Sequence, residues 1–215
     1  PLWSRYMLQA TRFSTNNALV YLADEWAKRA TRRRTGVDEL TERLAADASK
    51  LNGMLQAAQQ VGMGLGAVAL GFVLSRGREK AAFVFVPLVG AAAIAVFGPV
   101  GRLLDGVHLG PQVGSFCLLV IAGFGFGSTH PVSIRVAQRL LPHRTSLASG
   151  LMLGGAWSLS AIGPFAAKWL HQGFGKEELA RGDARLDSAI LVTAGVLAVS
   201  GALALLLPKS AMRSA

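Results

Sequence analysis

The stretch STHPVSIRVAQRLLPHRTSLASGLMLGGAWSLSAIGPF, residues 128–165, decides the fold. It begins at the end of one apolar run, passes through a short polar loop and enters a second apolar run. The loop has several basic side chains and no acidic one. These are Arg135, Arg139, His143 and Arg144. An apolar run, a basic loop and another apolar run are typical of two membrane spans joined outside the bilayer.

The second run of this stretch has a stripe of small residues. Ser146, Gly150, Gly154 and Ser158 recur every four positions, so in a helix they share one face. In lipid, a face of small residues lets another backbone approach closely. We therefore predict that Gly150, Gly154 and Ser158 are helix-packing positions, where helices can slide past one another.

The composition of the whole chain is that of a membrane protein. Of its 215 residues 52% are apolar and only 16% are charged, and long windows carry no charge at all. The formal net charge of +10 does not indicate a nucleic-acid partner, because the basic residues lie in short loops between apolar runs and set orientation there. The single cysteine, Cys117, excludes a disulfide within the chain.

The apolar runs predict an all-α, polytopic membrane protein with six spans. We expect a polar first span at 1–23, a charged helical insertion at 24–50, five transmembrane helices within 51–208 and a tail at 209–215. The first span contains Arg12, so a helix lying on the membrane surface is the alternative. The insertion is either a solvated helical loop or a basic segment that binds anionic lipid. The lack of an initiator methionine suggests a fragment of a longer protein.

The basic residues predict the orientation of the chain. Loops 76–80 and 135–144 and the tail have an excess of Lys and Arg, which marks their side as cytoplasmic. Loop 168–187 is balanced in charge and falls on the other side. The insertion 24–50 must then be external in spite of its own arginines. We follow the Lys and Arg excess of the other loops and the tail, and not the arginines of the insertion, in assigning the cytoplasmic side.

The run VAQRLLPHRTSLASGLMLGGAWSLSAIGP, residues 136–164, resembles the tenth-to-eleventh helix region of major facilitator superfamily transporters. It is most similar to the fosmidomycin-resistance-like efflux subgroup, in which a Gln, a Leu-Pro, a basic residue and Ala-Ser-Gly-Leu-Met-x-Gly follow in this order. Arg12-Phe13-Ser14 is similar to an Arg-x-Ser of the seventh helix. The resemblance implies the six-helix C-terminal half of a facilitator-type transporter. Its partner, an N-terminal half, is missing from this chain.

Polar side chains inside the spans are the candidate functional residues. They are Arg12, Asn16, Asn17, Gln56, Gln59, Gln60, His130 and Trp157. They fall on the first, second, fourth and fifth spans, which the resemblance implies are the cavity-lining ones. Each residue alone is as consistent with contacts between helices as with substrate binding. As a set they predict a substrate cavity.

The expected function is secondary transport of a small molecule by alternating access, as drug or metabolite efflux by proton antiport in the plasma (inner) membrane. Neither a cofactor nor a metal is expected, because the four histidines are scattered and no cysteine accompanies them. A non-transporting membrane subunit or receptor with the same fold is the alternative. A membrane-embedded enzyme is less favoured, because clustered His, Asp or Glu near one interface are lacking.

Overall fold

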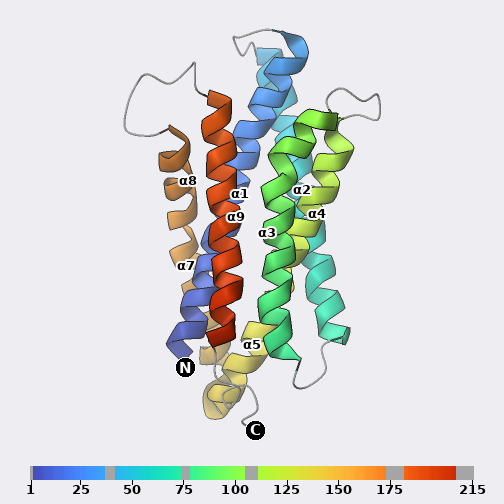
Figure 1. Ribbon diagram of the computed structural model, residues 1–215. Helices are drawn as coiled ribbons and strands as arrows, with labels where there is room; N and C mark the ends of the chain where they lie inside the picture. The colour runs from blue at the N-terminus through green and yellow to red at the C-terminus, as the bar shows by residue number, and fades with distance from the viewer. Residues whose placement is uncertain (1, 37–41, 74–77, 105–110, 173–181, 207–215) are drawn as a thin grey trace.

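The computed structural model describes residues 2–36, 42–73, 78–104, 111–172 and 182–206. All regular structure within these residues is helical (Figure 1). The first elements are α1 (Leu2–Thr35), α2 (Glu42–Val73), α3 (Glu79–Leu104), α4 (Pro111–Gly127) and α5 (Thr129–Leu140). After the 3₁₀ turn η1 (Pro142–Arg144) come α6 (Thr145–Gly150), the π-helical turn η2 (Leu151–Gly155), α7 (Ala156–Ser160) and α8 (Ile162–Gln172). The last are α9 (Gly182–Leu203) and the 3₁₀ turn η3 (Ala204–Leu206).

Four segments are long and apolar enough to cross a membrane. They are Glu79–Val100, Val113–Arg139, Pro142–Gln172 and Arg185–Leu206. This confirms the coarse prediction of an all-helical membrane protein. The helices α1 and α2 are not among the four, although both were predicted to be spans. Their arginines, asparagines and glutamines lower the hydropathy of any window that contains them.

The predicted insertion at 24–50 is not a separate element. The helix α1 continues through it to Thr35, and α2 begins within it at Glu42. Ion pairs support the extension of α1: Lys28 Nζ lies 2.6 Å from Asp24 and 2.9 Å from Glu25, at helical spacing. Gly36 ends the helix, because its φ of 65° is the left-handed conformation that only glycine adopts without cost.

The break between α4 and α5 at Ser128 lies one turn before Pro131. Proline has no N–H to donate to the preceding turn, so the sequence predicts a kink in this region. The hydroxyl of Ser128 donates a hydrogen bond of 2.6 Å to the Phe124 carbonyl and supports the turn. The bend carries α5 toward the lower end of the bundle in Figure 1.

Glycines bring α2 and α4 into direct backbone contact. A Cβ at Gly62 would overlap the carbonyl of Val120, and one at Gly123 would overlap the carbonyl of Gln59. Gly127 meets the backbone of Met63 in the same way. Such contacts are the known means by which helices associate in lipid. They make α2 and α4 a closely packed pair.

The helix α1 is central to the bundle and contacts α2, α7, α8 and α9 (Figure 1). Its Leu19, Leu22 and Trp26 are buried in the main apolar cluster. Trp26 packs on Phe97 of α3, with ring centroids 5.0 Å apart. A central helix has neighbours on several sides, so polar side chains at different angles on α1 meet different helices.

Candidate functional site

The polar side chains of α1 are hydrogen-bonded across the bundle. Gln59 Nε2 of α2 donates to Asn16 Oδ1 over 2.7 Å, and both side chains are buried. Asn17 Nδ2 donates to Ser160 Oγ of α7 over 2.8 Å. These bonds hold α1 to α2 on one side and to α7 on another. Asn16 and Gln59 therefore join helices and do not line an open cavity.

Arg12 does not face the predicted cavity. Its guanidinium lies between α3 and α9, where Nη2 donates to the Phe83 carbonyl over 2.8 Å. Its Nε lies 3.4 Å from Ser200 Oγ, and its Cζ lies 5.1 Å from the centroid of the Phe83 ring. The side chain is 1% exposed, and within the described residues Nη1 has no hydrogen-bond partner. The sequence alone could not predict this direction, because it depends on which helices surround α1.

An aromatic group joins α1 to α5 and α7. The ring of Phe13, which is buried, lies 4.4 Å from the His130 ring in an edge-on contact and 4.9 Å from the Trp157 ring. His130 is half-buried, whereas Trp157 is 48% exposed. The structure thus brings together two of the predicted residues, His130 and Trp157, through Phe13. One edge of this group reaches the surface at Trp157.

The remaining glutamines of α2 lie nearer the surface. Gln56 Nε2 donates to Asn52 Oδ1 over 3.2 Å, and Asn52 Nδ2 donates to Asp24 Oδ1 over 2.9 Å. Gln60 is exposed. Of the predicted cavity residues, Gln60 and Trp157 are therefore the ones that present an exposed side chain.

The predicted packing face on residues 146–158 packs against nothing within the described chain. Ser146, Gly150, Gly154 and Ser158 are exposed, and a Cβ at Gly150 or Gly154 would have no neighbour within 4 Å. The π-helical turn Leu151–Gly155 lies inside this face and widens the spacing between its residues. Close packing occurs instead at Gly155 and Gly163, against Tyr6 and the backbone of Ser14.

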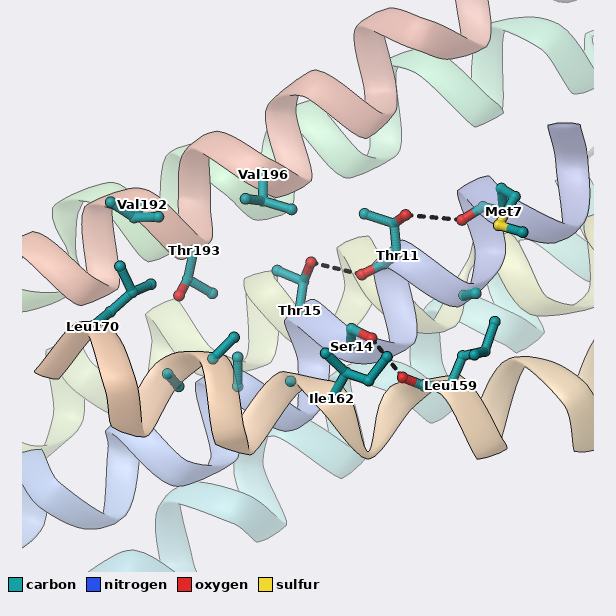
Figure 2. Close-up of a pocket in the computed structure, with 15 residues that line it drawn as sticks. Met7, Thr11, Ser14, Thr15, Leu159, Ile162, Leu170, Val192, Thr193 and Val196 are labelled. Carbon is teal, nitrogen blue, oxygen red and sulfur yellow. Dashed lines mark hydrogen bonds between the residues drawn. The ribbon is translucent and has the colours of Figure 1, made fainter. Parts of the chain in front are cut away.

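An apolar cavity in the described part of the chain lies elsewhere, between α1, α8 and α9. Its volume is about 400 Å³, and none of the predicted site residues lines it. Figure 2 shows the hydroxyls of Thr11, Thr15 and Ser14 turned onto backbone carbonyls. Thr11 donates to the Met7 carbonyl, Thr15 to that of Thr11 and Ser14 to that of Leu159. With these hydroxyls satisfied, the wall is effectively hydrocarbon.

The end of the bundle that holds α5 carries ionic contacts the sequence did not predict. Arg139 Nη1 of α5 lies 2.9 Å from Glu79 Oε1 at the start of α3, and Glu79 is 1% exposed. Lys80 Nζ donates to the Leu205 carbonyl over 2.7 Å and ties α3 to the 3₁₀ turn η3 that follows α9. The signal in the sequence was the lone acid, Glu79, within a basic turn.

Two further buried contacts were also missed. Ser133 Oγ of α5 lies 2.9 Å from Gln9 Oε1, and Ser200 of α9 meets Arg12. Serines are common in membrane helices and usually bond their own backbone, so sequence gives no sign of such partners. Among the described residues, no cluster of three His, Cys, Asp or Glu side chains could hold a metal ion.

The fold and these contacts define the class: a helical membrane protein in which a polar central helix is bonded to its neighbours. No protein-family model, no curated protein and no solved structure matches the chain.

Proposed function

We propose that the chain is one half of a secondary transporter that moves a small molecule across the plasma membrane by alternating access. The observation that carries the proposal is the uncovered face of residues 146–158. A Cβ added at Gly150 or Gly154 would have no neighbour within 4 Å, and the exposed Trp157 lies beside these glycines. The small residues form a narrow stripe beside the exposed leucines Leu147, Leu151 and Leu153, and such a stripe is suited to close contact with a second protein surface.

The contacts around this face support the same function. Phe13 links Trp157 to His130, and Asn17 is bonded to Ser160. The face is thus fixed to the central helix α1. A rigid half of this kind can rock as a body against a second half, with the substrate held between them. The resemblance of residues 136–164 to facilitator transporters supports the assignment, with efflux by proton antiport as the subclass.

Water access tests the proposal without knowledge of the substrate. In a Cys117→Ser background, Gly154→Cys should react in membranes with a water-soluble thiol reagent. Gly195→Cys on α9 is the matched control: the glycine is also exposed, and a Cβ there would have no neighbour within 4 Å. It should be inert because it lies among the apolar side chains of Val192, Val196 and Val199. Equal inertness of both cysteines in the membrane would show that the 146–158 face contacts lipid and would end the proposal.

The need for a second half is tested by reconstitution. If the chain supplies one side of a cavity, then residues 1–215 alone in liposomes with an imposed proton gradient should move no drug-like cation such as ethidium. Flux above empty vesicles from the purified chain alone would show instead that two copies form the path.

A further inference from the structure

The buried cation Arg12 has no acidic partner among its described contacts. Its neighbours are a carbonyl, a hydroxyl and an aromatic ring, from Phe83 and Ser200. A buried charge is costly unless it is paired, and here Nη1 lacks even a neutral partner within the described residues. An anion is the group that this environment lacks.

A second cavity adjoins Arg12 through Ser200. It has a volume of about 350 Å³ and runs between α1 and α9, and its lining includes Thr11, Gly195, Val196, Val199, Ser200 and Leu203. Ser200 Oγ is the atom that Arg12 Nε approaches at 3.4 Å. A ligand in this cavity would therefore reach the immediate surroundings of the guanidinium.

The two cavities form one groove, because Thr11, Val192 and Val196 line both. We name it the α1–α9 groove. The stretch of α9 from Val192 to Leu203 that lines it is about 16 Å long at the α-helical rise. Its rim is apolar and exposed: the exposed fractions of Val196 and Val199 are 42% and 57%. Farther along, the hydroxyls of Thr11 and Thr15 donate to backbone carbonyls (Figure 2), and that of Thr193 donates to the Ala189 carbonyl.

We propose that the α1–α9 groove binds a long-chain carboxylate, a fatty-acid anion, with its hydrocarbon chain along α9 and its head beside Ser200. Arg12 supplies the positive charge, and a guanidinium with a carboxylate is among the strongest charge-assisted pairs. The apolar wall supplies the remaining affinity by burying the chain. The cavity beside Ser200 lies between α1 and α9 alone and has a volume of about 350 Å³, which favours a one-chain fatty acid over a two-chain phospholipid.

This site is separate from the transport path proposed above. At about 100° per residue, Thr11 and Phe13 lie on opposite sides of α1. The end of the groove at Ser200 therefore lies away from Phe13, whereas Ala10 and Leu159 at its other end pack in the apolar cluster that contains Phe13. The groove opens beside α9, one of the four segments that can cross a membrane. Binding here requires no assumption about what the protein transports.

The test is equilibrium binding of tritiated oleate to the purified 215-residue chain in detergent, with oleyl alcohol as the uncharged competitor. We expect saturable binding of oleate and an affinity for the alcohol that is about tenfold lower, because the alcohol lacks the charge that Arg12 pairs. Arg12→Gln should lower the affinity for oleate to that for oleyl alcohol. Equal affinities of the unmodified chain for oleate and the alcohol would overturn the proposal, and that comparison does not require Arg12→Gln to fold.

A filling variant checks the location. Gly195→Phe places a ring in the groove that Gly195 lines, since a Cβ there would have no neighbour within 4 Å, and should abolish oleate binding. Gly71→Phe on α2 is the matched control, at an exposed glycine with equally open surroundings, and should bind oleate normally. Unchanged binding by Gly195→Phe would place the ligand elsewhere. Displacement of oleate by dioleoyl phosphatidate at equal concentration would show that the ligand is an acidic phospholipid, and the fatty-acid assignment would be wrong.

Discussion

Each polar side chain of α1 is bonded to a different helix, because successive residues turn by about 100° around the axis. Arg12 meets α3 and α9, Asn16 meets α2, and Asn17 meets α7. In a membrane such bonds contribute on the order of 1 kcal/mol each, so several together are needed to fix a helix. The polar side chains of α1 lower its hydropathy below that of a typical membrane span, and the same side chains hold it at the centre of the bundle by hydrogen bonds.

The Asn16–Gln59 bond should behave as a coupled pair. Gln59→Leu should lower the free energy of unfolding by about 1 kcal/mol, because it leaves the buried Asn16 without its partner. Asn16→Leu should do the same, and the double variant should lose less than the sum of the two. Thermal unfolding in detergent measures this, with exposed Gln60→Leu as the neutral control. Strict additivity would show that the bond does not contribute.

At the scale of elements, glycine positions decide which helices touch. On α2, Gly62 and Gly66 are buried against α4, while Gly64 is exposed with open space around it. The sequence shows glycines on several faces of this helix and does not distinguish them. Their roles depend on how the helix is rotated in the bundle, which is set by all its neighbours together.

Alanine at Gly123 should therefore separate α2 from α4. Its Cβ would overlap the Gln59 carbonyl, and overpacking of this kind costs about 1–3 kcal/mol. Gly64→Ala is the matched change at an open position and should be neutral or slightly stabilising, because alanine favours the helix. Melting temperatures of the two variants in the same detergent give the comparison. A Gly123→Ala variant as stable as the parent chain would contradict the close contact.

Element type and approximate place were predictable from the sequence, because long apolar runs and the break near Pro131 are local signals. The ends of α1 and α2 were not, since charged residues of 24–50 form helix as readily as loop. The small stripe at 146–158 was recognised, but its neighbours were not. A pattern with a four-residue period identifies a face of a helix and does not identify what covers that face. In the same way, the sequence identifies Arg12 as a charged residue within a helix but does not identify the helices that its guanidinium contacts.

For the whole molecule, the two ends of the bundle differ in charge balance. The end where α5 lies (Figure 1) has one described acid, Glu79, among its basic residues, whereas the end of α1 and the start of α2, at the opposite end, mix acidic and basic residues. Arg139 pairs with the buried Glu79, and Lys80 bonds the end of α9. Exposed Arg135, His143 and Arg144 lie on or beside α5 at the same end. Such an excess of positive charge favours the cytoplasmic side.

The orientation can be tested with one cysteine at each end. In a Cys117→Ser background, Thr35→Cys at the end of α1 should be labelled in intact cells by an impermeant thiol reagent. His143→Cys, at the opposite end, should be labelled only after the membrane is permeabilised. Both positions are exposed, so accessibility within the protein does not differ. Labelling of His143→Cys but not Thr35→Cys in intact cells would reverse the topology.

The Glu79–Arg139 pair should hold the α5 end of the bundle together. Arg139→Gln leaves a buried carboxylate without its cation, which should cost about 1–3 kcal/mol of unfolding free energy. Arg135→Gln, an exposed change on the same helix, should have no effect. Unfolding in detergent measures both. Equal stability of the two variants would show that the pair is dispensable.

The π-helical turn Leu151–Gly155 has a consequence for how this sequence compares with those of evolutionary relatives. A π turn contains one residue more than the α turn it replaces, so it corresponds to a single inserted codon in an otherwise regular helix. Relatives without the turn should align to this chain with a one-residue gap between 150 and 156 and continuous pairing on both sides. Deletion of Leu153 would let an α turn replace the π turn and would leave the segment from Ala156 onward at nearly its present rotation relative to Thr145. Ser160 would then still face Asn17.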